Sequence, residues 1–219
     1  IEHVEETADL MPQMDDPDSS SAGLSDLTQS PGSHLLEVEA GNDATAARVR
    51  DLVETLARHL ACFHESLPRL PGTVANGKST LDWLLESFDE IKSHPLFSTV
   101  PEAAEWTSFR EDLKATFECH LPWRRQRIEQ GFFRPCHGDL HLGNIVLWQD
   151  RVMAFDALEF DDSLSNIDVM NDLAFAYMDL LANRLPELAS RLLNTYLEES
   201  GDYEGVRLLP EYAAYRALV

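Results

Sequence analysis

The segment His-Gly-Asp-Leu-His-Leu-Gly-Asn at residues 137–144 constrains this chain most, because it combines two glycines with several side chains that bind metals or move protons. An apolar run, 145–148, follows at once, and a second run, 151–155, comes after the polar pair Gln149 and Asp150. Two such runs separated by a two-residue turn are typical of a β-hairpin. The polar segment is therefore expected at the open end of a hairpin.

The two-residue turn also predicts how the strands of the hairpin pair. Counting outward from the turn places Asn144 opposite Phe155, so that Asp156 becomes a neighbour of Asn144. An amide oxygen and a carboxylate brought together in this way are hard ligands, which suit Mg²⁺ better than zinc. Asp139 lies on the loop that leads into the same end of the hairpin, where it could hold a reacting hydroxyl.

Composition excludes some classes of function. The 219 residues suffice for one large domain, and 44% hydrophobic and 26% charged residues are usual for a globular protein. The formal net charge is -22, so a nucleic-acid-binding surface, which needs clustered cations, is not expected. We expect the small cluster of Arg124, Arg125 and Arg127 to be a solvated helix face. The acidic excess would steer a cationic substrate, but it is equally compatible with a saline habitat or with simple solubility.

The cysteines and the apolar segments favour a cytoplasmic protein. Cys62, Cys119 and Cys136 are odd in number and form no Cys-x-x-Cys pair, so neither a disulfide framework nor a zinc knuckle is expected. We find no run of about 18 apolar residues and no secretory signal, so no membrane span is expected. The sequence opens on Ile1 without a methionine, which suggests a fragment or a processed chain.

Helical periodicity dominates the rest and predicts an α+β fold. Residues 1–14 show a short helical pattern, and residues 15–43 have the Ser, Asp, Gly and Pro content of a flexible acidic linker. Residues 44–219 read as one mostly helical domain with a single hairpin. We expect helices at about 43–66, 79–94, 101–130 and 186–201, and one more over a stretch that includes 173–181. The helix at 101–130 should have a kink or break at Pro122. A last helix is expected to be incomplete at the chain end.

Some residues carry more specific expectations. Helical spacing places Phe63 and Phe109 in the core, while His59 and His64 are interpreted as helix-end or packing residues. Residues 157–166 are expected to form a solvated acidic loop. Its carboxylates could alternatively meet a cationic acceptor: Glu159, Asp161 and Asp162.

Residues 72–79, Gly-Thr-Val-Ala-Asn-Gly-Lys-Ser, match the phosphate-loop pattern GxxxxGKS. A phosphate loop must follow a buried strand, so that backbone amides and a helix N-terminus converge on the phosphates. The preceding residues 67–71 contain two prolines and an arginine, which do not form a central strand. We interpret the segment as an exposed loop that leads to Ser79, a helix cap that forms a capping box with Asp82.

The motif HGDLHLGNI, the hairpin after it and the segment FDALEF resemble the phosphotransferase motif of the aminoglycoside phosphotransferase and choline kinase family, relatives of the protein kinases. The step Asp172-Leu173-Ala174 is also similar to that family, and Asp172 would brace the motif from the next helix. The resemblance implies the helical C-terminal lobe of a protein-kinase-like fold and an ATP-dependent phosphotransferase acting on a small-molecule hydroxyl. FDALEFD is similar to a bacterial subgroup in which some members carry a separate P-loop ATPase domain, so such a partner domain is expected.

The resemblance also implies a role for each polar residue of the motif. Asp139 would be the catalytic aspartate that orients the hydroxyl or accepts its proton. Asn144 and Asp156 would hold Mg²⁺ against the ATP phosphates. His137 and His141 would belong to the nucleotide site by shaping its loop through hydrogen bonds to the backbone.

The sequence departs from this family on its amino-terminal side. The family's glycine-rich loop and its phosphate-binding lysine are not found, because Lys78, Lys92 and Lys114 do not lie in suitable strands. Residues 1–14 would be at most a hinge from a missing amino-terminal lobe. On this expectation the fragment alone would turn over poorly or not at all.

Two alternative functions are compatible with the motif. One is a metal-dependent hydrolase that binds zinc or manganese through four side chains: His137, Asp139, His141 and Asp156. Against it, Gly138 and Gly143 favour a turn over a helix, so the two imidazoles need not share a face. The other is a non-catalytic, pseudokinase-type binding module.

Overall fold

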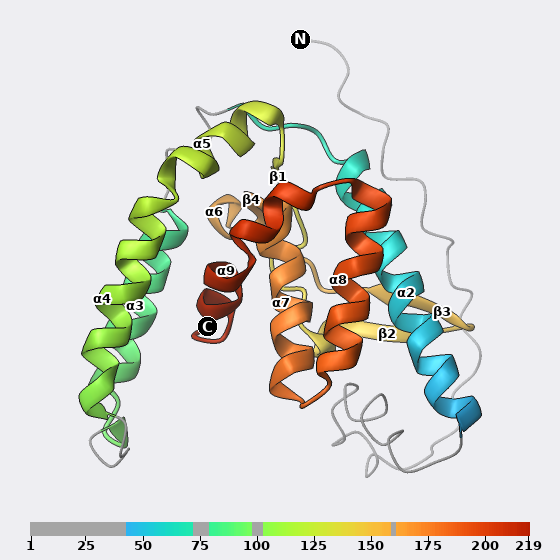
Figure 1. Ribbon diagram of the computed structural model, residues 1–219, viewed down its shortest axis with the longest axis horizontal. Coiled ribbons are helices and arrows are strands. Elements are labelled where there is room, and N and C mark those ends of the chain that lie inside the picture. Colours follow the sequence, from blue (N-terminus) through green and yellow to red (C-terminus); the bar gives the residue numbers. More distant parts are fainter. Residues whose placement is uncertain (1–42, 72–78, 98–102, 159–160) are drawn as a thin grey trace, which may run out of the picture.

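Helices make up most of the structure, and the strands form two small antiparallel sheets (Figure 1). The computed structural model describes residues 43–71, 79–97, 103–158 and 161–219. The expected hinge, nearly all of the expected linker, residues 72–78 of the GxxxxGKS segment and Glu159 lie outside these ranges. The described residues confirm a mostly helical α+β fold.

The elements follow one another in an order close to that expected from the sequence. They are α2 (Asp43–Ser66), α3 (Thr80–Ser93), α4 (Ala103–Cys119), α5 (Leu121–Gln130), β1 (Phe133–Pro135), the 3-10 turn η4 (Leu142–Asn144), β2 (Ile145–Trp148), β3 (Arg151–Ala154), α6 (Asp162–Ser165), β4 (Asn166–Asp168), α7 (Val169–Ala182), α8 (Pro186–Ser200), the 3-10 turn η5 (Tyr203–Arg207) and α9 (Leu209–Arg216). Within the described ranges, no helix combines the length and apolar character that crossing a bilayer requires.

The main core lies where α2, α7, α8 and α9 pack together (Figure 1). Helix α2 buries Leu56 and Leu60 on its predicted stripe, and its principal neighbour is α8. Helix α7 packs between α8 and α9 and buries residues on most of its sides, in keeping with its apolar composition. The bundle's largest fully buried side chains include Met170, Leu173, Leu192, Tyr196, Leu208 and Tyr212.

Helices α3 and α4 form a separate arm, which α5 connects to the rest of the molecule, so that the whole has the outline of an arch (Figure 1). Phe88 and Trp106 hold the arm together with ring centroids 4.8 Å apart. The predicted capping box is confirmed, because Ser79 and Asp82 exchange backbone-to-side-chain hydrogen bonds at the start of α3. The predicted interruption at Pro122 is a true break between α4 and α5.

Two predicted core residues are wrong, since Phe63 and Phe109 are 39% and 45% exposed. Residue 64 continues the four-residue spacing of Leu56 and Leu60, so His64 takes the buried position instead of Phe63. Phe109 lies on the arm formed by α3 and α4, where contact with α3 alone leaves part of its ring exposed to solvent.

Three further features of the chain differ from expectation. Strands β1 and β4, which pair antiparallel, were not predicted, because runs of three residues are too short to show a periodic pattern. The expected loop at residues 157–166 is wrong in its second half, where Asp161 accepts a hydrogen bond of 2.8 Å from the Ser163 N–H and caps α6. Helix α9 ends at Arg216, before the last residue Val219.

The basic cluster of α5 is not a solvated face. Arg127 is 3% exposed and binds two buried carboxylates, Asp168 at 2.6 and 2.8 Å and Asp202 at 2.6 Å. Arg124 pairs with Glu211 of α9, so only Arg125 of the three is exposed. Burial would lower the pKa of Arg127, but the two carboxylates raise it well above its usual value, so the side chain stays charged. This cluster ties α5 to the start of α7 and to the segment before η5.

Replacing Arg127 with leucine is expected to lower the free energy of unfolding by about 3–5 kcal/mol, because Asp168 and Asp202 are left buried without a counter-charge. Urea unfolding followed by circular dichroism measures the change. The matched control, Arg125→Leu on the exposed side of α5, should change stability by less than about 0.5 kcal/mol. Equal losses in the two variants would contradict a stabilising role for the buried cluster.

Candidate active site

The β2–β3 hairpin has the predicted register. Trp148 pairs with Arg151 and Ile145 with Ala154, so the turn consists of Gln149 and Asp150. Both turn residues have positive φ, 49° and 60°, as the type I′ turn that joins twisted strands requires. Beyond the strands, the Phe155 N–H donates to the Asn144 carbonyl at 3.0 Å, which confirms that these two residues lie opposite each other.

The loop before the hairpin is held by buried apolar residues that alternate with its polar ones. Leu140, Leu142 and Ile145 are at most 8% exposed and belong to the main core. Gly138 has a φ of 82°, and a Cβ atom there would lie 2.9 Å from the Leu164 carbonyl oxygen. The tight backbone at this point therefore requires glycine.

Asp139 and Asn144 face each other inside the loop. The Asn144 side-chain N–H groups donate to the carbonyl oxygen of Asp139 at 2.9 Å and to its carboxylate at 3.0 Å. Both partners only accept, so the Asn144 nitrogen must face them and its oxygen must face away. That oxygen has no hydrogen-bond partner among the residues described, and the Asp139 side chain remains 34% exposed.

The two histidines of the motif bond to the backbone, as the sequence suggested. His137 is 5% exposed, receives the Asp139 N–H on Nδ1 at 3.3 Å and donates from Nε2 to the Phe155 carbonyl at 2.9 Å. His141 accepts the Gly143 N–H at 3.0 Å, and its Nε2 lies 3.6 Å from the Asp139 carboxylate. His137 thus joins the loop to the far strand, and neither of its nitrogens is left for a ligand.

Asp156 follows the hairpin at a sharp turn of the chain. Its φ is 62°, a conformation that costs free energy in a residue other than glycine and often marks functional sites. Two residues later the Leu158 N–H donates to the His137 carbonyl at 2.9 Å, which returns the chain to the loop. The Asp156 side chain is exposed and has no hydrogen bond or ion pair with the described residues.

Asp172 braces the loop from α7, as predicted. Its fully buried carboxylate accepts the backbone N–H groups of His137 at 3.2 Å and Gly138 at 2.8 Å. It also accepts a hydrogen bond of 3.0 Å from His64 of α2, whose other nitrogen bonds the Tyr196 hydroxyl of α8 at 2.9 Å. Burial alone would raise the pKa of Asp172, but the His64 hydrogen bond and the charge of Arg216 lower it below the usual value.

The interpretation of His64 as a helix-end or packing residue did not include its hydrogen bond to Asp172. Its position on the buried stripe of α2 could have indicated such a partner, since a buried polar side chain needs a hydrogen bond. Arg134 of β1 was also missed. It donates to the carbonyls of His64, Glu65 and Leu67 at 2.5–2.9 Å and so satisfies the end of α2.

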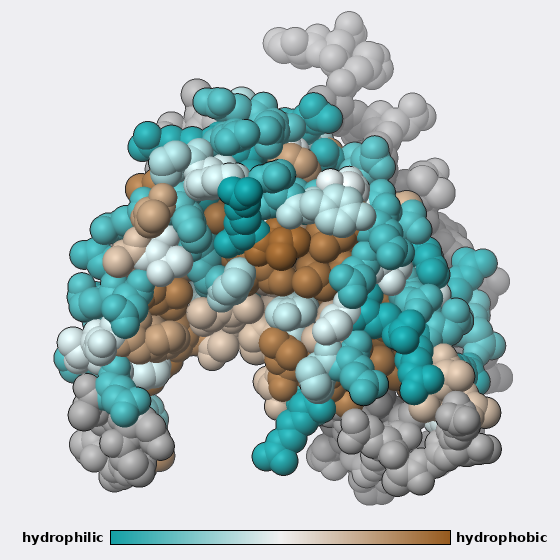
Figure 2. Space-filling view, viewed as in Figure 1, coloured by the Kyte–Doolittle hydropathy of each residue, from teal (hydrophilic) through white to brown (hydrophobic). Residues whose placement is uncertain are grey.

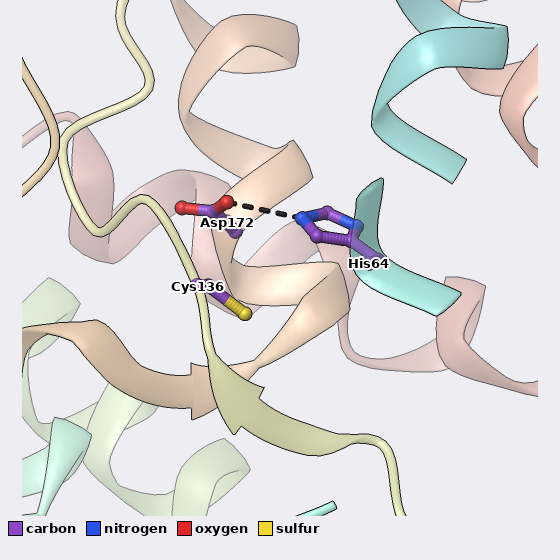
Figure 3. Close-up of side chains that lie close together, drawn as sticks. All are labelled: His64, Cys136 and Asp172. Atoms are coloured by element: carbon purple, nitrogen blue, oxygen red, sulfur yellow. Dashed lines mark hydrogen bonds and ion pairs between the residues drawn. The ribbon is translucent and has the colours of Figure 1, made fainter. Parts of the chain in front are cut away.

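Two residues of this brace, His64 and Asp172, also form a cluster of possible metal ligands with Cys136. His64, Cys136 and Asp172 point toward one another from α2, the segment after β1 and α7 (Figure 3). Both nitrogens of His64 and both oxygens of Asp172 already make hydrogen bonds. Burial and the nearby carboxylates raise the pKa of the Cys136 thiol well above its usual value, whereas a metal needs the thiolate. We therefore interpret the cluster as a structural brace.

The hydrolase alternative finds no support in the geometry. In the part of the chain that the structure describes, no three of its proposed zinc ligands converge on one point. Both nitrogens of His137 already bond backbone groups, so this residue has none left for a metal. The loop also turns at Gly138 instead of forming a helix, as the sequence suggested.

Asp172→Asn is expected to lower the free energy of unfolding by about 2–4 kcal/mol at neutral pH, because two buried N–H groups and His64 lose a charged acceptor. The folded-state pKa of Asp172 lies below its ordinary 3.8. The stabilisation that the Asp172 carboxylate contributes is therefore complete above the ordinary pKa of 3.8. It is lost as the pH falls through the lower pKa of the folded state. Urea unfolding at a series of pH values should show a gap between the two proteins that closes on acidification.

The exposed α2 variant Asp51→Asn serves as the control and should leave stability nearly unchanged. A gap between wild type and Asp172→Asn that is absent, or that does not depend on pH, would contradict the brace.

Comparisons with known proteins agree with this geometry. Residues 15–209 match the model of the phosphotransferase enzyme family. Uncharacterized proteins of Mycobacterium tuberculosis (strain H37Rv) and Mycobacterium bovis are each 37% identical over 93 residues, which are 42% of this chain and 19% of each relative. The match thus spans a minor part of these longer relatives, and no solved structure matches the chain. Because the family model covers most of its length, the chain belongs to the phosphotransferase enzyme family.

Proposed function

We propose that the chain transfers the γ-phosphoryl group of ATP to a hydroxyl group of a small molecule. The observation that carries the proposal is the Asp139–Asn144 pair, which aims an amide oxygen away from the loop while the carboxylate keeps an exposed side. Phosphoryl transfer needs in-line positioning and charge neutralisation more than covalent chemistry, so this small set of groups is sufficient on its side of the site.

The residues at the open end of the hairpin fit Mg²⁺. Asn144 offers a neutral oxygen and Asp156 a carboxylate, both hard donors, and neither donor is engaged by another described residue. The register brings the two residues to the same end of the hairpin. We propose that they hold the ion together; when bound, it would neutralise charge on the ATP phosphates.

Asp139 would orient the acceptor hydroxyl and take its proton. Its carboxylate is fixed on one side by the Asn144 amide, so the other side is directed outward. The loop backbone is held rigidly by Asp172, Gly138 and the buried leucines, which keeps the carboxylate from drifting. A rigid support of this kind is what positioning catalysis requires.

The fold assignment belongs to the same proposal. We infer that the described residues are the C-terminal lobe of a protein-kinase-like fold, with the hairpin as its catalytic-loop element. Lys92 and Lys114 lie on α3 and α4, so the described residues offer no strand lysine to the ATP phosphates. A glycine-rich lobe, a P-loop ATPase partner domain and a cytoplasmic location stay predictions from the sequence.

Asp156→Asn is expected to weaken Mg²⁺-dependent ATP binding at least about tenfold, since it removes the only anionic ligand assigned to the ion. Asp139→Asn should leave Mg²⁺-dependent ATP binding intact, because Asp139 is not assigned as a metal ligand. Isothermal titration of ATP into the chain, with Mg²⁺ and with excess chelator, measures both. Where phosphoryl transfer to water or to an acceptor is detectable, Asp139→Asn should reduce it by about 10²–10⁴.

The control Asp162→Asn removes an equal charge from an exposed position of the neighbouring segment and should behave as wild type. ATP binding that ignores Mg²⁺, or that tolerates Asp156→Asn, would refute the assigned metal site. Turnover that survives Asp139→Asn would refute the catalytic role.

A further inference from the structure

A cavity of about 750 Å³ lies beside Asp139, between the α3 arm and the start of the loop. Its walls come from α3, from Gly138 and Asp139, from Phe175 of α7 and from the last residues of the chain after Tyr215. Figure 2 shows the hollow between the arm and the body of the arch, bordered largely by apolar surface. Its volume suits a small organic molecule, and it meets the proposed catalytic carboxylate directly.

The polar and apolar groups of this cavity are unevenly distributed. Most of the wall is aromatic or aliphatic: Trp83, Ile91, Phe97, Leu164, Phe175 and Tyr215. Asp139 and Arg216 both line the cavity, and Arg216 donates to the carbonyl of Gly138, the residue before Asp139, at 2.9 Å. The acidic residues Glu86 and Glu90 are exposed but also line the cavity on its α3 side, together with Ser87 and His94. A ligand would therefore meet Asp139 and Arg216 at its reacting end, mostly apolar groups along its body, and the polar residues of the α3 side along one edge.

Arg216 adds an unusual feature to the polar end. It is 5% exposed, its Nε donates to the Asn171 side chain at 3.0 Å, and its guanidinium lies 5.0 Å from the centre of the Phe175 ring. Its Nη2 is buried and has no hydrogen-bond partner among the described residues. An unmet buried donor costs free energy, and an oxygen atom of a ligand in this cavity could satisfy it after a small adjustment of the side chain.

We propose that this cavity binds the phosphoryl acceptor, and that the acceptor is an alcohol with an apolar, ring-sized body whose oxygens are gathered at one end. The inference rests on the proposed function. One hydroxyl would lie at Asp139 and a neighbouring oxygen near Arg216, while the body contacts Phe175 and Tyr215. A polyhydroxylated amino sugar fits less well, because Glu86 and Glu90 could contact its ammonium group but its ring hydroxyls would lose water against the aromatic part of the wall.

The test uses two probes of contrasting chemistry, 1-(2-naphthyl)-1,2-ethanediol and glucosamine. Binding of each to the full chain is measured by isothermal titration without nucleotide. Ser87→Trp and, independently, Val219→Trp place a bulky ring in the cavity wall, while Ser93→Trp places the same ring on α3 outside it. Thermal unfolding checks that each variant is folded, and Val219 is exposed enough to tolerate the change.

The diol should bind wild type and Ser93→Trp alike. It should bind at least about tenfold more weakly to either folded blocking variant, because the ring displaces its apolar contacts. Glucosamine should bind wild type more weakly than the diol does. Diol binding that ignores both blocking variants, or glucosamine binding in preference to the diol, would overturn the inference.

The two proposals fail in different ways. If MgATP binds as proposed but the diol does not bind, the acceptor class is wrong and the proposed function stands. If the diol binds in the cavity but MgATP does not bind at all, the proposed function is wrong, and with it the assignment of the cavity to an acceptor.

Discussion

The buried carboxylate of Asp172 is the contact on which the geometry of the site depends. It joins three parts of the chain that are far apart in sequence: the end of α2 through His64, the loop through the N–H groups of His137 and Gly138, and α7, which carries it. In an interior of low polarity these hydrogen bonds are strong, and leaving any of the donors unpaired is costly. The loop can therefore present Asp139 to solvent while its own backbone stays fixed.

The polar side chains of the loop that Asp172 supports differ in the direction of their hydrogen bonds. Asn144 turns its nitrogen inward to Asp139 and its oxygen outward, whereas His137 uses both nitrogens to hold the loop against the hairpin. Asp139 also lines the cavity beside α3, whose wall is mostly apolar. Asp139 is thus common to the proposed acceptor cavity and to the contact with Asn144, the proposed metal ligand, so that it belongs to both parts of the proposed transfer site.

Local patterns predicted a large part of this arrangement. The two-residue turn determined the hairpin register, and helical spacing located α2, α3, α7 and α8, because both depend on neighbours in sequence. Long-range polar contacts were not predictable in the same way. Arg127 looked like part of a surface cluster, and only the fold shows that Asp168 and Asp202 surround it. The hydrogen bond from Arg216 to the carbonyl of Gly138 likewise joins residues 78 positions apart, so the sequence pattern near Arg216 does not predict it.

The central claim is that Asn144 and Asp156 hold one divalent ion opposite Asp139. Anomalous diffraction from crystals of the chain grown with Mn²⁺ and ATP locates such an ion directly. We predict a peak about 2.1 Å from both the Asn144 side-chain oxygen and an Asp156 carboxylate oxygen. A peak instead among His64, Cys136 and Asp172, or ATP bound with its phosphates remote from the hairpin, would contradict the claim.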